Sequence, residues 1–265
     1  MIEELEELRS IDNDIFEEFQ KANQYLPWLL RESPIPKTVE LFYIYLGSTN
    51  FIKNSIFDCA ENEDIYSVNI LFRSIVEHFL RFQYIWFNYC QGGKEEFSIR
   101  YYTALNLSEQ LSYLKAANAV NALNKGKVKT TNEIWADLQQ HNPKALQSSI
   151  NEIENFSKSI SIKNIIKFIE QNIESGKLQN NGFLKDLILR YSTLSSFVHG
   201  GISAHHNIVN YEKSNKRNHD LVIMCGLALQ TASFVKLFSF LIFYQVKPEF
   251  GDIYNKTHEF IKEIE

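Results

Sequence analysis

The chain has 265 residues with 27 basic and 32 acidic side chains, so its net charge of −5 provides no overall attraction to nucleic acid. It contains 20 phenylalanines and 13 tyrosines but only 10 glycines and 5 prolines, too few turn residues for an all-β chain. Three separated cysteines, Cys59, Cys90 and Cys225, form no C-x-x-C pair, which argues against a disulfide framework or a zinc knuckle.

The N-terminal segment predicts a helix and not an export signal. It begins MIEELEELRS, with acidic residues where a secretory leader would carry basic ones before an apolar run, so we expect a cytoplasmic protein. The first helix is expected over Glu3–Tyr25, with a stop at Pro27. A second is expected over Lys37–Ala60, and a third from an N-cap at Asn62 to the glycines near residue 92.

The residues that begin and end helices in the rest of the sequence predict helices to the end of the chain. They are expected at about 94–124, as shorter elements within 133–176, and at 182–198, 216–246 and after Pro248. The predicted fold class is therefore all-α, a bundle of long helices. We interpret residues 1–265 as a single helical domain with core helices at about 38–92 and 182–246 and a helical insertion at about 94–178.

The run from Leu221 to Tyr244 is long enough to span a bilayer, which takes about 20 residues. However, Lys236 lies inside it, and a charge near the centre of a span costs on the order of 2.5 to 3.5 kcal/mol. We expect a central core helix and no membrane; a membrane segment stays open as the alternative.

A polar stripe interrupts the apolar third helix. Arg73 and Glu77 are four positions apart and share one face with Asn69. Polar side chains in such an aromatic helix need partners. The simplest interpretation is an intrahelical ion pair of the ordinary surface kind, worth about 0.3 to 0.5 kcal/mol.

A second polar stripe lies near the end of the helix predicted over 182–198. Tyr191, Ser195 and His199 are spaced by four, and Gly200 or Gly201 suits the left-handed residue that ends a helix. The negative helix end favours protonated His199. Its role is either a C-terminal cap or a functional side chain.

The two stripes together resemble the HEPN superfamily of prokaryotic helical domains, and more closely a bacterial family of uncharacterised function with Arg-x3-Glu and Ser-x3-His motifs. Arg73, Glu77, Ser195 and His199 carry the resemblance. HEPN ribonucleases also carry an Arg followed a few residues later by His, as His78 follows here. The present motif departs from that pattern, because it lies early in the chain and a serine follows the arginine.

The resemblance implies a metal-independent endoribonuclease in phage defence or toxin-type growth arrest, without metal or cofactor. It implies RNA as substrate, a homodimer, and a cognate antitoxin or other protein as partner. We name three candidate catalytic residues, Arg73, His78 and His199. The supporting polar network would consist of Glu77, Tyr191 and Ser195.

The chemistry needs a histidine to take the proton of an RNA 2′-hydroxyl and an arginine to stabilise charge on the phosphate. Arg73 and His78 are five positions apart, about 140° around a helix, so they share a target only if the phosphate bridges the helix flank. His199 is then the alternative base.

The alternative function is a non-catalytic helical protein-interaction module in which the same buried polar network is structural. The solvent exposure of the polar network distinguishes the two functions. An open cleft with basic edges favours catalysis, and a network sealed in the core favours the interaction module. A metal site at Glu133, Asp137 and His141 is a weaker possibility than a solvated helix face.

Overall fold

The computed structural model describes residues 2–175, 182–213 and 216–264. Within these ranges every regular element is a helix, so the all-α prediction is confirmed. The first half contains α1 (Ile2–Asn23), α2 (Leu26–Arg31), α3 (Pro36–Glu61), α4 (Ile65–Asn88), a π-helical turn (Tyr89–Gly93), α5 (Lys94–Leu123) and α6 (Thr131–His141). The second half contains a 3-10 turn (Pro143–Gln147), α7 (Ile150–Ser159), α8 (Ile162–Glu174), α9 (Gly182–Val198), α10 (Ile202–Lys213), α11 (Arg217–Val246) and α12 (Phe250–Lys262).

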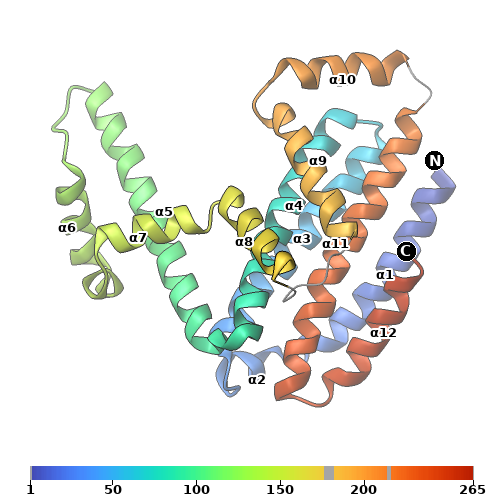
Figure 1. The fold of residues 1–265 in the computed structure, drawn as a ribbon, viewed down its shortest axis with the longest axis horizontal. Helices are drawn as coiled ribbons and strands as arrows, with labels where there is room; N and C mark the ends of the chain where they lie inside the picture. The colour runs from blue at the N-terminus through green and yellow to red at the C-terminus, as the bar shows by residue number, and fades with distance from the viewer. Residues whose placement is uncertain (1, 176–181, 214–215, 265) are drawn as a thin grey trace.

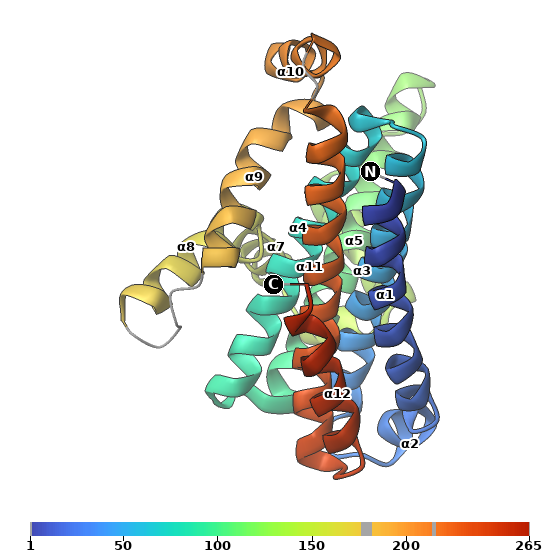
Figure 2. The same ribbon diagram turned by 90° about the vertical axis from the view of Figure 1, so that its right-hand side faces the viewer.

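An aromatic core joins helices from both ends of the chain (Figures 1 and 2). The ring of Phe42 on α3 lies 5.1 Å from that of Phe82 on α4 and 6.2 Å from that of Phe243 on α11. All three side chains are fully buried. Rings of this size remove much apolar surface from water, so their packing stabilises the bundle.

The helix α11 runs through the middle of this bundle, between α9 and α1 in Figure 2. It is the one helix of the described residues that is long and apolar enough to cross a membrane by length and composition alone. Of its most apolar 18-residue window, 61% is buried inside the fold, as expected for a core helix.

A bent connection turns the chain out of the bundle after α4. Gly92 adopts φ +108°, a backbone conformation that favours glycine. Next to it, the Glu95 carboxylate accepts hydrogen bonds from the backbone N–H groups of Lys37 and Thr38, 2.6 and 3.0 Å long. Glu95 therefore caps α3 and fixes the base of α5 against the bundle.

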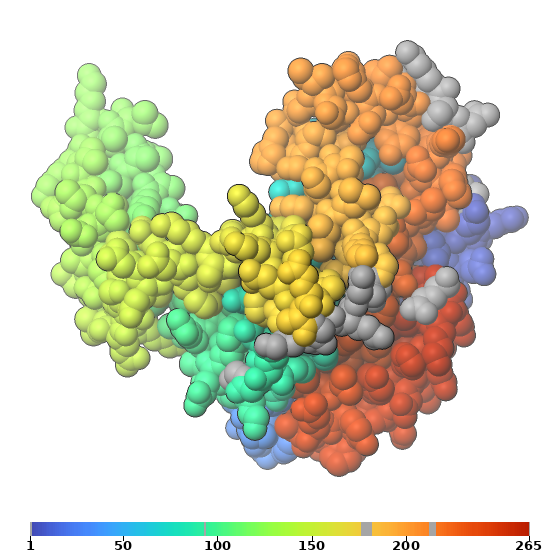
Figure 3. Space-filling view, in the orientation of Figure 1, coloured from blue at the N-terminus to red at the C-terminus, as the bar shows by residue number. Residues whose placement is uncertain are grey.

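The distal part of α5, with α6, the 3-10 turn and α7, forms a projection that we call the arm (residues 104–159; Figure 1). A small separate core holds the arm together, with Leu107, Leu111, Trp135 and Ile153 among its buried residues. In the space-filling view an open notch separates the arm from α9 and α10 (Figure 3).

The structure differs from the local expectations at four places. Pro27 does not only end α1, since it lies in the first turn of the unpredicted helix α2, where its missing N–H costs nothing. The N-cap of α4 is Asp64, whose carboxylate accepts from Ser67 N–H at 3.1 Å, and not Asn62. The helix α10 was not predicted, and 143–147, within the region expected to hold shorter helices, form a 3-10 turn.

Candidate functional site

The helices α4 and α9 pack against each other in antiparallel directions. The Tyr66 hydroxyl, near the start of α4, donates to the Phe197 carbonyl near the end of α9, 3.1 Å away. At the other end of the pair, the rings of Phe79 and Phe183 are 6.0 Å apart. This register brings the middle of α4 opposite the middle of α9.

Arg73 occupies the middle of this interface. Its Nη2 donates to the Tyr191 hydroxyl at 3.0 Å, and its guanidinium lies 4.7 Å from the centre of the same ring. Its Nη1 donates to Glu77 Oε2 at 3.3 Å. The arginine side chain is only 15% exposed, so these bonds offset part of the cost of removing its charge from water.

Glu77 extends the network along α4. Its Oε1 accepts from Arg81 Nη2 at 3.4 Å, and Arg81 Nη1 donates to the Ile160 carbonyl between α7 and α8 at 3.2 Å. The polar chain therefore connects α9, α4 and the base of the arm. Sequence reasoning missed Arg81, although its position four residues after Glu77 is a sufficient signal.

His78 points away from Arg73, toward α3. Its Nδ1 lies 2.8 Å from the Ser74 carbonyl oxygen, and its ring stands edge-on to Tyr45 with centroids 6.2 Å apart. Because a carbonyl oxygen only accepts, Nδ1 carries the proton and Nε2 of the neutral ring has the free lone pair. Arg73 and His78 are therefore not brought together within one chain.

Tyr45, whose ring contacts His78, and its partner Tyr101 are not suited to act as bases. The oxygens of Tyr45 and Tyr101 are 3.1 Å apart in the core. Burial raises the pKa of both phenols above the usual value, so both hydroxyls stay protonated near neutral pH.

Ser195 and His199 lie toward the other end of α9. The helix ends at Val198, and Gly200 adopts φ +63° while Gly201 N–H donates to the Ser196 carbonyl at 2.7 Å, which confirms the predicted glycine cap. His199 is exposed and eight residues beyond Tyr191, about 12 Å along the axis. Among the described residues, no side-chain hydrogen bond joins Ser195 or His199 to Arg73 or Glu77.

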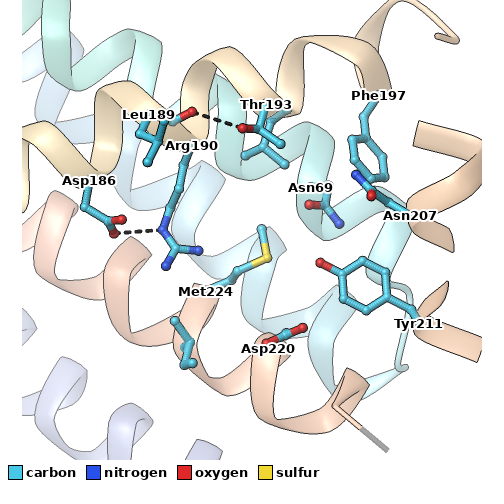
Figure 4. Close-up of a pocket in the computed structure, with 12 residues that line it drawn as sticks. Asn69, Asp186, Leu189, Arg190, Thr193, Phe197, Asn207, Tyr211, Asp220 and Met224 are labelled. Carbon is cyan, nitrogen blue, oxygen red and sulfur yellow. Dashed lines mark hydrogen bonds and ion pairs between the residues drawn. The ribbon is translucent and has the colours of Figure 1, made fainter. Parts of the chain in front are cut away.

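A pocket of about 350 Å³ adjoins this network, enclosed by α4, α9, α10 and α11 (Figure 4). Asn69, one turn before Arg73, contributes to its wall from α4. The other lining residues are Asp186, Leu189, Arg190, Thr193, Leu194, Phe197, Asn207, Tyr211, Asp220, Ile223 and Met224. Sequence reasoning missed the pocket because its walls come from helices far apart in the chain.

The weaker metal candidates on α6 have other roles. Glu133 accepts from the Thr130 backbone N–H at 2.7 Å in a capping box, and Asp137 pairs with Lys129 at 2.5 Å. Within the described ranges, no three His, Cys, Asp or Glu side chains are grouped so that they could hold a metal ion.

Of the comparisons with known proteins, the one with protein families finds a match. A family model described as "Family of unknown function (DUF5677)" matches residues 41–217, which include both polar stripes and all of the arm. No curated protein and no solved structure matches the chain.

Proposed function

The chain belongs to the DUF5677 family of unknown function, and from that premise we propose that it is a non-catalytic helical module that binds a protein partner. One observation carries this proposal. The three candidate catalytic side chains have three different surroundings: Arg73 faces Tyr191, His78 faces Tyr45, and His199 lies exposed beyond the end of α9.

Cleavage of RNA needs a base and a cation at one phosphate. Arg73 donates from Nη2 to Tyr191 and from Nη1 to Glu77, whereas its Nε is buried without a partner in the described part of the chain. An arginine held in this way fastens α9 to α4. The supporting network is then structural, and the HEPN-like resemblance concerns the helical framework.

The arm is the proposed partner-binding surface. Tyr113 and Val120 on α5 are 73% and 54% exposed, and they are seven positions apart, about 20° around the helix. Tyr113 also lines an apolar groove of about 360 Å³ between α5 and α6. An exposed apolar stripe beside a groove is typical of a protein interface. The partner proposed first is a second copy of the chain.

The ribonuclease is the second candidate, and one observation favours it. The bond from His78 Nδ1 to Ser74 leaves Nε2 as a proton acceptor on a partly exposed ring, which is the form a general base needs. If the chain is a ribonuclease, RNA is its substrate and a partner subunit supplies the cation that His78 needs at the phosphate. The cleavage would then serve growth arrest or phage defence.

RNA integrity in expressing cells, with and without phage challenge, separates the two candidates. We expect intact RNA with the wild type, with the double variant Arg73→Ala, His78→Ala, and with His199→Ala. Circular dichroism establishes that each variant is folded. RNA fragments that appear with the wild type and vanish with a folded His78→Gln or His199→Ala variant would overturn the proposal and identify the base.

A further inference from the structure

Two opposite charges in the pocket between α4, α9, α10 and α11 lack a full set of partners. Arg190 uses its Nε to bond Asp186 Oδ2 at 2.7 Å, and its two Nη atoms make no hydrogen bond within the described ranges. Across the pocket, the Asp220 carboxylate makes no side-chain hydrogen bond or ion pair in the part of the chain that the structure describes. Among the described residues, the pocket therefore holds two guanidinium nitrogens and one carboxylate that have no protein partner.

Both charges act on the same hydroxyl. Burial raises the pKa of Tyr211, the Asp220 carboxylate raises it further, and the Arg190 guanidinium opposes that effect. All three groups line the pocket, so each charge faces the same cavity as the Tyr211 hydroxyl. Among the described residues, Arg190 and Asp220 do not form an ion pair with each other, although both line the same pocket.

The rest of the lining adds one amide and an apolar wall. Asn69 is 98% buried, since its exposed fraction is 2%, and its Nδ2 donates to the Ile65 carbonyl at 2.6 Å. Its Oδ1 has no hydrogen-bond partner among the described residues and lies at the pocket. Met224 and Phe197 supply apolar surface beside these polar groups.

We propose that this pocket binds a small zwitterion, a free α-amino acid, with its carboxylate on Arg190 and its ammonium on Asp220 and Asn69. Its side chain contacts Met224 and Phe197. A guanidinium offers paired donors that match a carboxylate, and an ammonium donates to carboxylate and amide oxygens. The volume of about 350 Å³ is at the small end for ligand pockets.

A nucleotide fits this pocket less well. Its phosphates would place several negative charges beside Asp186 and Asp220, with one arginine to offset them. A zwitterion adds no net charge and pairs both free groups at once. This inference does not rest on the protein-binding function proposed above, because the arm contributes no residue to the pocket.

Isothermal titration calorimetry of the full chain with each of the twenty protein amino acids tests the proposal. We expect at least one to bind, and its decarboxylated amine and its α-hydroxy acid analogue to bind at least tenfold more weakly. No binding by any amino acid overturns the proposal. Equal binding of the amine alone, or of a nucleoside monophosphate in its place, also overturns it.

Substitutions in the pocket test whether the amino acid binds there. Arg190→Gln and Asp220→Asn should each weaken binding tenfold or more, and Thr193→Phe should block the space without removing a charge. The matched controls, Arg100→Gln and Asp252→Asn, change exposed charges outside the pocket and should bind as the wild type does. Circular dichroism verifies folding. Unchanged binding by folded Asp220→Asn and Thr193→Phe would assign the ligand to another site.

Discussion

Two lysines share one carboxylate in the core between α1, α3 and α11. The side chains of Lys53 and Lys236 are 1% and 2% exposed, and both ammonium groups lie near Asp12. Asn50 Oδ1 accepts from them at 3.2 and 3.4 Å. Because one negative charge does not offset two buried positive ones, burial and the nearby Lys53 lower the pKa of Lys236 to about 7, although Asp12 opposes the shift.

This lysine predicts a pH-dependent stability. Between about 7 and the ordinary value of 10.5, unfolded Lys236 holds a proton that the folded side chain lacks. The free energy of unfolding therefore rises with pH in that window, by up to about 1.4 kcal/mol per pH unit. Urea denaturation between pH 6.5 and 9.5 should show a steeper rise in wild type than in Lys236→Met, because burial also lowers the pKa of Lys53, which remains in the variant.

The exposed Lys216→Met variant is the matched control for this titration, and it should keep the wild-type slope. If Lys236→Met and wild type show parallel curves over the whole range, Lys236 is charged in the folded protein and the assignment is wrong.

Sequence spacing predicts one of the two side-chain partners of Arg73. Its pair with Glu77 follows from positions one helical turn apart, and the structure contains that pair. Tyr191 lies 118 residues later, and its bond to Arg73 depends on how α9 packs against α4. The sequence identified Tyr191 as a polar residue needing a partner, but periodicity within a helix does not specify a partner on another helix.

At the scale of elements, the long helices, the short ones within 133–176 and the one after Pro248 were predictable, whereas α2 and α10 were not predicted. The expected helix over 182–198 ends where α9 ends, at Val198, because a turn residue follows it. In the helix α10, Ala204, Ile208 and Tyr211 are spaced by four and three residues and pack on the core, a helical pattern that the sequence analysis missed. This helix provides one wall of the pocket.

The arm leads to a prediction about self-association. If Tyr113 and Val120 form the interface between two copies, sedimentation velocity should show a dimer for the wild type and a monomer for the double variant Tyr113→Ser, Val120→Ser. Polar replacements there remove apolar area without disturbing a core, since both side chains are more than half exposed.

Phe51→Ser on α3 provides the control, because Phe51 is 74% exposed and lies on the bundle. It should leave the dimer intact. A wild type that stays monomeric at every concentration would exclude a second copy as the partner, and a dimer lost only in Phe51→Ser would move the interface to α3.

At the scale of the whole molecule, the packing of α4 against α9 links the network to the pocket. Arg73 and Tyr191 join the two helices, and Asn69 and Arg190, on the same helices, line the cavity. The polar residues of each helix can be read from the sequence, but the register in which α4 packs against α9 cannot. Four helices from distant parts of the chain enclose the pocket, so its charges became apparent only in three dimensions.

The central claim is that Arg73 and Tyr191 are structural partners, and a double-mutant cycle tests it most directly. Urea denaturation of Arg73→Met, Tyr191→Phe and the double variant should give a coupling of about 0.5 to 1.5 kcal/mol. The same cycle with Tyr66→Phe, whose hydroxyl bonds Phe197 instead, should give a coupling near zero. Additive losses for Arg73 and Tyr191 would contradict the account, since the arginine would then be free for another role.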